Sequence, residues 1–330
     1  MWIATLTAAV AGCGRIGFDL GGGGDDAAAD GAGIVDAPML PVDAPTGSDA
    51  ALAVAWVEAN PQPGTTNALW GVYGLSASDL WIAGTVGTIF HFEGAAWSPI
   101  ANPATDTLFY FWASASDDVW VVGRGCQALR WNGATWAATA TPGCAISVDL
   151  FAIDGAAAND LWAVGTSGTI LRWNGASWST TSQGTNDFWC VWVASATDVY
   201  LTGTRGTLLY WNGTTYASDN GAPNVTMAAI WGTGSGEYWS VGGGGTIMHK
   251  VGAAAWVQVP SPTTTFLYGV AGSSASDVWA VGSGGVIIHY DGLAWTAATS
   301  PTTQTLRNVR HLLGGGFRAV GDNGMVLTHP

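Results

Sequence analysis

Acidic side chains recur along the chain at nearly constant spacing, and a pair of carboxylates is the usual acid and base of a hydrolase. In this sequence, however, they stand one per repeat, in the same turn between two expected strands. Aspartate in such a turn accepts hydrogen bonds from nearby backbone N–H groups. We therefore interpret them as turn residues and predict no catalytic residue. The recurring positions are Asp79, Asp118, Asp160, Asp198, Glu237 and Asp277.

A second repeated position, twelve residues further on, carries imidazole or guanidinium groups in most copies. A metal site needs ligands that converge within a few ångströms, whereas equivalent positions of different repeats diverge. The alternation of Asp, Asn and Gly typical of a calcium loop is also missing. We expect structural polar residues here, with no metal ion and no cofactor. The occupants are His91, Arg130, Arg172, Tyr210, His249 and His289.

The element that positions both sets is a repeat of about 40 residues, marked by an aromatic residue after the acidic turn. Successive markers are 39, 42, 38, 39, 40 and 39 residues apart, and a glycine follows each marker by three positions. The short apolar runs around them, bounded by glycine, are typical of β-strands. The markers are Trp81, Trp120, Trp162, Tyr200, Trp239, Trp279 and, in the seventh copy, Arg318.

Turn residues divide each repeat into four strands. Asn132-Gly133 and Asp291-Gly292 are examples of pairs that favour a type I′ hairpin turn. A single four-stranded unit cannot bury both of its faces, so the units must stack on one another. Radial stacking predicts an all-β fold, a seven-bladed β-propeller over residues 51–330.

The motif at Asp160–Trp178 has the form Asp-[Leu/Val]-Trp-x-[Val/Ala]-Gly-x-x-Gly-Thr-Ile-x-x-Trp-[Asn/Asp]-Gly-x-x-Trp. It resembles the seven-bladed propellers of the photosystem II assembly-factor type and, more loosely, the Asp-box repeats of sialidases. The resemblance covers residues 51–330 and implies the fold, while propellers host many activities. The sialidase order Ser-x-Asp-x-Gly-x-Thr-Trp is not reproduced, and glutamate occurs only at Glu58, Glu93 and Glu237. We therefore expect a protein that is not an enzyme.

Composition sets further limits. The chain has 330 residues, 20 tryptophans and a formal net charge of −14, with nine Lys plus Arg. So acidic a chain repels phosphate backbones, which argues against a nucleic-acid partner.

The first residues resemble an export signal. Residues 2–12 are apolar and too short to span a bilayer, and Val10-Ala11-Gly12-Cys13 resembles the lipobox of bacterial lipoproteins. The resemblance implies lipidation of Cys13 and anchoring by lipid alone, at the bacterial outer membrane or cell surface. Residues 14–50, rich in Gly, Ala, Asp and Pro, are expected to be a disordered tether. The domains are thus 1–13, 14–50 and 51–330.

Two further predictions concern a disulfide bond and the strand that closes the ring. Cys126 lies in the turn after the strand that carries the marker Trp120, and Cys144 lies in the loop leading to the third repeat. Both segments emerge on one face, so we predict a disulfide, whereas Cys190 is expected to be buried and reduced. Blade 7 ends after its third strand, so residues 51–58, with Trp56, are expected to supply the fourth.

A ligand position is predicted in the innermost strand, eight residues before each marker. The residue just before this position is β-branched or aromatic in every repeat, as at Val72 and Ile153, which is what packing between blades requires. The residue at the position itself varies from repeat to repeat. We expect it to face the central channel, where aromatic and charged groups suit a sugar or a peptide end. The alternatives are that these side chains merely plug the channel, or that the site lies in the loops of Arg124, Asp187 and Arg205. The position holds Tyr73, Trp112, Asp154, Trp192, Trp231, Ala271 and Arg310.

These observations favour a monomeric, non-catalytic binding or scaffold propeller at the cell envelope, with an unknown protein or carbohydrate as partner. One alternative is an assembly factor that docks on a membrane protein complex. Another is a carbohydrate-active enzyme of sialidase-like type.

Overall fold

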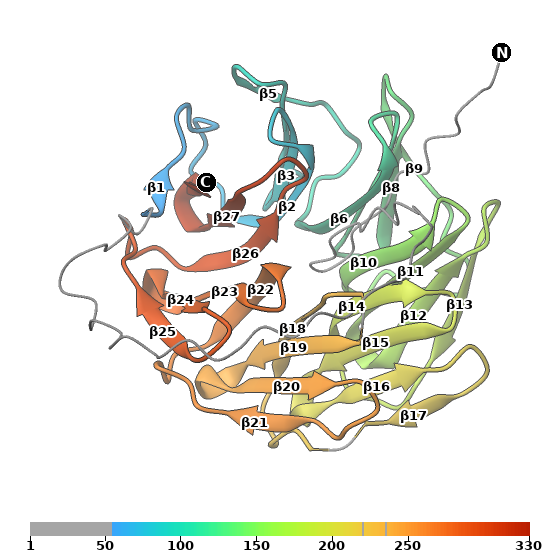
Figure 1. Ribbon diagram of the computed structural model, residues 1–330. Helices are drawn as coiled ribbons and strands as arrows, with labels where there is room; N and C mark the ends of the chain where they lie inside the picture. Colours follow the sequence, from blue (N-terminus) through green and yellow to red (C-terminus); the bar gives the residue numbers. More distant parts are fainter. Residues whose placement is uncertain (1–54, 220, 235) are drawn as a thin grey trace, which may run out of the picture.

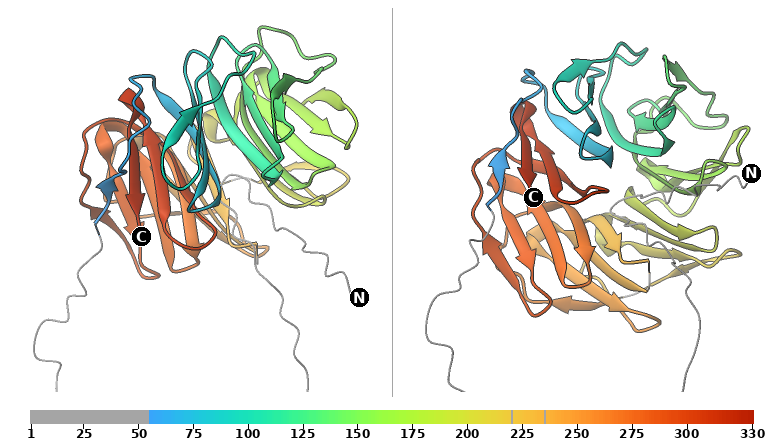
Figure 2. Two further views of the ribbon diagram at one scale, coloured as in Figure 1. Left: turned by 90° about the horizontal axis from the view of Figure 1, so that it is seen from above. Right: turned by 45° about the horizontal axis from the view of Figure 1, so that its top comes forward.

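The computed structural model describes residues 55–219, 221–234 and 236–330, which form seven four-stranded antiparallel sheets in a ring (Figure 1). The predicted seven-bladed β-propeller is therefore confirmed. Figure 2 shows the ring from two further directions. The predicted signal peptide, the lipidation site Cys13 and the tether lie outside the described residues. Within the described ranges, no helix is long and apolar enough to cross a membrane.

Each blade runs from an inner strand a to an outer strand d. Strands a are β2 (Leu69–Ser76), β6 (Leu108–Ala115), β10 (Leu150–Ala157), β14 (Phe188–Ser195), β18 (Met227–Gly232), β22 (Leu267–Ser274) and β26 (Leu306–His311). Strands b are β3 (Asp79–Gly84), β7 (Asp118–Gly123), β11 (Asp160–Gly165), β15 (Asp198–Gly203), β19 (Glu237–Gly242), β23 (Asp277–Gly282) and β27 (Phe317–Gly321).

Strands c are β4 (Ile89–Phe92), β8 (Gln127–Trp131), β12 (Thr169–Trp173), β16 (Leu208–Trp211), β20 (Ile247–Val251), β24 (Ile287–Tyr290) and β28 (Val326–His329). Strands d are β5 (Trp97–Pro99), β9 (Trp136–Ala138), β13 (Trp178–Ser182), β17 (Tyr216–Ser218), β21 (Val257–Val259), β25 (Trp295–Ala298) and, for blade 7, β1 (Val57–Glu58). Short 3-10 turns join strands b and c in five blades: Thr166–Gly168, Thr204–Gly206, Gly243–Gly245, Ser283–Gly285 and Asp322–Gly324.

The ring closes through the N-terminal strand, as predicted. β1 pairs with β28, with Val57 opposite Thr328. The side chain of Gln62 extends this edge, because its amide donates to the Val326 carbonyl at 2.8 Å and accepts from the Val326 N–H at 3.0 Å. The first segment and the last strand therefore complete one blade together, which covers an otherwise open sheet edge.

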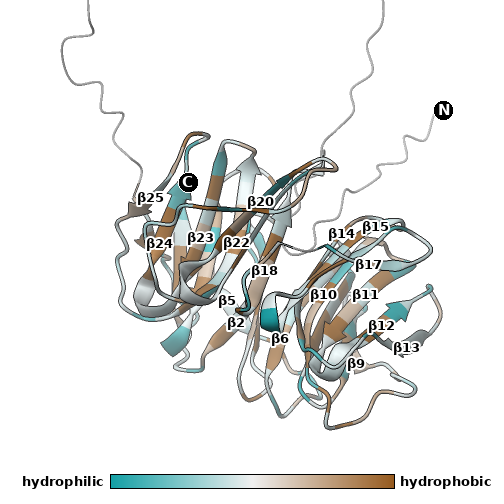
Figure 3. Ribbon diagram, turned by 90° about the horizontal axis from the view of Figure 1, so that it is seen from below, coloured by the Kyte–Doolittle hydropathy of each residue, from teal (hydrophilic) through white to brown (hydrophobic). Residues whose placement is uncertain are grey.

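Aromatic side chains fill the seams between blades. Trp81 of blade 1 lies 5.4 Å from Trp131 and 5.5 Å from Trp136 of blade 2, measured between ring centroids. Trp279 of blade 6 meets Trp56 in the same edge-on arrangement at 5.5 Å. The interpretation of the recurring aromatics as core residues is confirmed. Figure 3 shows that hydrophobic segments, in brown, run along the strands inside the blades.

The turns between strands c and d differ from the predicted type I′. That turn needs positive φ at both central residues, whereas here Gly133 has a φ of 88° and Asn132 is not among the residues with positive φ. The Asn132 side-chain oxygen instead accepts the N–H groups of Ala134 and Thr135 at 3.0 and 2.9 Å. The same side-chain-capped turn recurs at Asn174, Asn212 and Asp291.

Five of the six recurring acidic residues bond to the recurring basic position of strand c, an arrangement that the sequence did not predict; the sixth, Asp198, accepts a hydrogen bond from Tyr238. Strand pairing places His91 opposite Trp81, and Asp79, two residues earlier, lies on the same face. The base therefore stacks on the marker, with the His91 and Trp81 centroids 4.0 Å apart, and bonds to the acid. The pairs are Asp79–His91 (2.7 Å), Asp118–Arg130 (2.7 Å), Asp160–Arg172 (3.2 Å), Glu237–His249 (2.8 Å) and Asp277–His289 (2.8 Å).

Ring closure by β1 predicts that Trp56→Ala destabilises the whole propeller. Trp56 is 3% exposed, and removing so large a buried side chain costs about 3–5 kcal/mol. We expect a single unfolding transition in denaturant at a lower midpoint. Val57→Ala, at the next residue but half exposed, is the matched control and should change the free energy of unfolding by less than about 0.5 kcal/mol. Equal midpoints for wild type and Trp56→Ala would show that the ring closes in another way.

The pair Asp277–His289 predicts a pH-dependent contribution to stability. Burial raises the pKa of Asp277, but hydrogen bonds from His289, Ser273 and Trp279 outweigh it, so the pKa lies below the usual value. The unfolded chain then binds more protons as the pH falls, so the stabilisation is present above about pH 4 and disappears below the folded-state pKa.

Replacing Asp277 with Asn should therefore cost about 1 kcal/mol near neutral pH. The difference from wild type should shrink as the pH is lowered through 4 towards 2. Denaturant unfolding at each pH measures it, with Asp117→Asn in an exposed turn as control. A difference that stays constant with pH would contradict the assignment.

Candidate binding site at the mouth of the central channel

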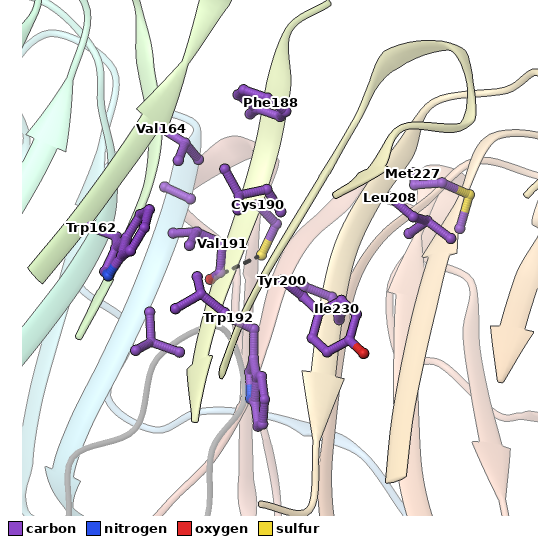
Figure 4. Packing of buried hydrophobic residues seen from close by; sticks show 14 of the residues in the cluster. Trp162, Val164, Phe188, Cys190, Val191, Trp192, Tyr200, Leu208, Met227 and Ile230 are labelled. Carbon is purple, nitrogen blue, oxygen red and sulfur yellow. Dashed lines mark hydrogen bonds between the residues drawn. The ribbon is translucent and has the colours of Figure 1, made fainter. Parts of the chain in front are cut away.

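The predicted ligand position does not face the channel. Trp112, Asp154, Trp192 and Trp231 are fully buried, Arg310 is 2% exposed and Tyr73 3%. Each packs against the next blade instead, so the expectation of a channel-facing site at this position is wrong. Figure 4 shows Trp192 within one such packed cluster.

Three contacts show how these side chains hold adjacent blades together. The Trp112 indole N–H donates to the Gly155 carbonyl at 3.1 Å. The Asp154 carboxylate accepts the N–H groups of Gly155 and Val193, each at 2.7 Å, and so links blades 3 and 4. The Arg310 guanidinium lies 4.6 Å from the centre of the Tyr73 ring, across the seam between blades 7 and 1. The alternative that these side chains plug the channel is not supported either, because they lie between blades.

A β-bulge in every inner strand explains why another position faces the channel. In blade 1 the pairing runs from Leu69–Gly84 directly to Gly71–Ala83, so Trp70 has no partner on strand b. A bulge residue is released from the ladder and its side chain is re-aimed. The corresponding shift occurs in all seven blades. The bulge residues are Trp70, Phe109, Phe151, Trp189, Ala228, Tyr268 and Arg307.

These seven side chains meet at one end of the channel. Together they line a pocket of about 330 Å³, with Tyr110 and Arg124 also in its wall. Because the bulge residues come from all seven inner strands, the pocket lies on the ring axis. A volume of this size accommodates a small ligand or one or two peptide side chains. We call this feature the channel mouth.

The aromatic rings of the channel mouth contact one another around the axis. Trp70 and Phe109 have centroids 5.3 Å apart, Phe109 and Phe151 are also 5.3 Å apart, and Phe151 and Trp189 are 5.5 Å apart. Blade 5 contributes the small Ala228. Phe266 bridges this sector, because its ring lies 6.1 Å from Trp189 and 4.5 Å from Tyr268, measured between centroids.

Arg307 completes the circle as a cation between two rings. Its guanidinium carbon lies 3.9 Å from the centre of Trp70 and 5.6 Å from that of Tyr268. It also forms a two-pronged ion pair with Asp322, at 2.6 and 3.1 Å. Arg124 lies 3.5 Å from Asp149. Both guanidiniums are thus matched by carboxylates, so the channel mouth is suited to stacking and apolar contact more than to binding a free anion.

A polar layer lies next to the aromatic one. The Tyr110 hydroxyl lies near the side chains of Asn308 and Arg310. Burial raises the pKa of Tyr110, while the nearby Arg310 charge opposes the rise and Asp154 adds to it. Tyr110 therefore stays a neutral phenol that can donate or accept a hydrogen bond at the pocket wall.

The predicted disulfide lies on the face of the channel mouth. Cys126 and Cys144 are bonded, with Cα atoms 6.1 Å apart. Cys190 is buried as expected, but its expected reduced state is not supported, because the described part of the chain contains no free cysteine. Among the alternative loop residues, Arg124 lines the channel mouth. Arg205 lines a separate pocket of about 410 Å³.

The described residues contain no group of three or more His, Cys, Asp or Glu side chains that could hold a metal ion. Five of the six recurring carboxylates are each held within their own blade by the base on strand c.

Comparison with known proteins shows a similarity of fold alone. No family model matches the sequence, and no curated protein matches it. The fold is similar to YCF48 from Cyanidioschyzon merolae, with a TM-score of 0.69 and 19% identity over 83% of this chain and 98% of that chain. A structure described as YCF48 bound to D1 peptide gives 0.68 and 18% over 86% and 99%. Streptogramin B lyase gives 0.71 and 12% over 85% and 99%, so an enzyme shares the same architecture.

Truncating a side chain that packs between blades should cost more unfolding free energy than truncating one at the bulge position. Trp112→Ala removes a fully buried ring between blades and should cost about 3–5 kcal/mol of unfolding free energy. Trp189→Ala removes a half-buried ring at the channel mouth and should cost less than half as much. Denaturant unfolding of both variants measures the difference. Equal losses would contradict the assignment of Trp189 to a solvent-facing position.

Proposed function

We propose that this chain is a non-catalytic binding propeller that holds a peptide segment of a protein partner at the channel mouth. One observation carries the proposal: seven bulge residues, one from each blade, line a single pocket on the axis with mainly aromatic surface. Aromatic rings and arginine are the side chains that dominate binding energy at protein interfaces. The pocket is formed by rigid strands, so little conformational entropy is lost when a ligand binds.

The chemistry of the pocket favours a peptide with an apolar or aromatic anchor. Its two arginines are already paired with aspartates, which disfavours phosphate or a free carboxylate as the main determinant. Tyr110 offers a hydrogen bond to a backbone carbonyl or N–H group. The YCF48 structure named for its D1 peptide supports the idea that a propeller of this type takes a peptide.

We further propose that the propeller works outside the cytoplasm, as a lipoprotein of the bacterial envelope. The support is the sequence Val10-Ala11-Gly12-Cys13, which resembles a lipobox. Under this proposal the lipid on Cys13 holds the chain at the membrane, and residues 14–50 separate the propeller from it.

A random-peptide display library, selected against the full chain, tests the binding proposal. We expect enriched peptides that share an aromatic or aliphatic anchor. Their affinity should fall at least about tenfold in Phe151→Ala and Trp189→Ala, because these rings form the pocket wall. Leu293→Ala, an exposed residue on an outer loop, should bind like wild type.

Circular dichroism of each variant establishes that the fold is retained. Failure to enrich any peptide, or equal binding by all variants, would contradict a peptide site at the channel mouth. Enrichment of glycans instead of peptides on an array of both would replace the peptide with a sugar as ligand.

A further inference from the structure

A valine occupies a strained and exposed position beside the channel mouth. Val86 lies in the turn between strands b and c of blade 1, has a φ of 59° and is 71% exposed. The preceding residue, Thr85, lines the channel mouth. For a β-branched residue this left-handed conformation is an outlier, because the side chain crowds the backbone. Val86 therefore carries a backbone cost that burial of its side chain does not offset.

The other blades show that the turn does not require an apolar side chain. The corresponding residue has a positive φ in each of the other six blades and is there either polar or glycine. The six residues are Gly125, Ser167, Arg205, Gly244, Gly284 and Asn323. Glycine adopts this conformation without strain, and backbone strain that the fold does not need is typical of functional positions. The valine of blade 1 thus points to a contact outside the chain.

A second aliphatic side chain is exposed on the same face. Ile146 is 90% exposed in the loop between blades 2 and 3, which the Cys126–Cys144 disulfide fixes to the neighbouring turn. The Ile146 carbonyl oxygen lies 3.6 Å from the position that a Cβ atom would take at Gly125. Gly125 follows Arg124, which lines the channel mouth. Ile146 is therefore fixed beside the rim of the channel mouth.

A chain of contacts connects the two aliphatic residues. The turn of Val86 reaches Asp106, because the Gly87 N–H donates to the Asp106 carbonyl at 2.8 Å. The Asp106 carboxylate lies 3.9 Å from the Arg124 guanidinium. Arg124 begins the turn of blade 2 against which Ile146 lies. Val86, Asp106, Arg124 and Ile146 thus form one continuous strip across blade 2, which we call the rim strip.

The charges of the rim strip leave a negative excess. Arg124 is shared by two carboxylates, because it lies 3.5 Å from Asp149 and 3.9 Å from Asp106. Two aspartates and one arginine give a net charge of −1, and Asp106 is half exposed. Aliphatic ends with an excess negative charge between them complement a segment that carries both apolar and basic side chains. The formal net charge of −14 favours the approach of such a segment.

We propose that the peptide partner, anchored in the channel mouth, leaves it across blade 2 and binds the rim strip through aliphatic side chains and one basic residue. The aliphatic side chains cover Val86 and Ile146, and the basic group pairs with Asp106. Burial of Val86 by the partner is the gain that the strained turn lacks in the free chain. This inference rests on the proposed function, because the same segment enters the channel mouth.

The first test separates binding from stability at Val86. Val86→Gly gives blade 1 the residue found in blades 2, 5 and 6, so this variant should melt no lower than wild type. Peptides enriched from the random library on the full chain should nevertheless bind it at least about fivefold more weakly in calorimetry, because an apolar contact is lost. Ile146→Ser should weaken binding similarly. Ser167→Gly, at the same turn position of blade 3, is the matched control and should bind like wild type.

The second test concerns the charge of the partner. Peptides enriched on the wild-type chain should carry Lys or Arg near their apolar anchor, and selection on Asp106→Asn should remove this preference. Asp291→Asn removes an equal charge from an outer turn that has asparagine in blades 2, 3 and 4. Selection on this control should retain the preference for a basic residue.

The outcomes distinguish the rim strip from the channel mouth. Peptides that need Phe151 and Trp189 but bind Val86→Gly and Asp106→Asn as tightly as wild type would overturn the rim strip and leave the proposed function intact. Failure to enrich any peptide would contradict both. A lower melting temperature of Val86→Gly would make the valine a structural residue and overturn its role in binding. A dimer in sedimentation that Val86→Gly dissociates would replace the partner with a second copy of this chain.

Discussion

Packing of aromatic rings across the seams is the interaction on which the rest of this structure depends. A four-stranded blade has two apolar faces, and Trp81 or Trp279 is buried only when the neighbouring blade supplies its rings. A buried ring of this kind removes about 150–250 Å² from water, which amounts to about 4–6 kcal/mol. Because the last seam needs Trp56 from the start of the chain, the ring is stable as a closed unit and not as separate blades.

Closure of the ring determines which side chains of the inner strands reach the central channel. Seven inner strands brought together leave a narrow channel, and the position held by Trp112 and Trp192 is committed to packing against the next blade. A bulge near the start of each inner strand releases one residue from that constraint. The seven released side chains then meet on the axis, where Arg307 lies against Trp70 and closes the aromatic lining. The channel mouth is thus a consequence of the blade geometry, and its chemistry is set by the seven residues at the bulge position.

Much of the architecture can be predicted from the sequence, because each element has a local signal that recurs. The spacing of the markers predicts the blades, the missing last strand predicts the role of Trp56, and turn positions predict that Cys126 and Cys144 meet. The site could not be predicted in the same way. A bulge shifts the alternation of strand a by one residue, so counting back from the marker selects Trp112, which packs against the next blade, instead of Phe109 in the wall of the channel mouth. The sequence shows that residues differ at the bulge position, but it does not show the bulge that directs these side chains to the channel mouth.

The residue at the bulge position lines the channel mouth, whereas the residue three positions later is sealed between blades. Hydroxyl-radical footprinting with mass spectrometry of the full chain measures this residue by residue. Oxidation at Trp70, Trp189 and Tyr268 with protection of Trp112 and Trp231 is the result this account predicts. Rapid oxidation of Trp112 and Trp231, with Trp70 and Trp189 protected, would contradict it and return the candidate site to the other position of the inner strand.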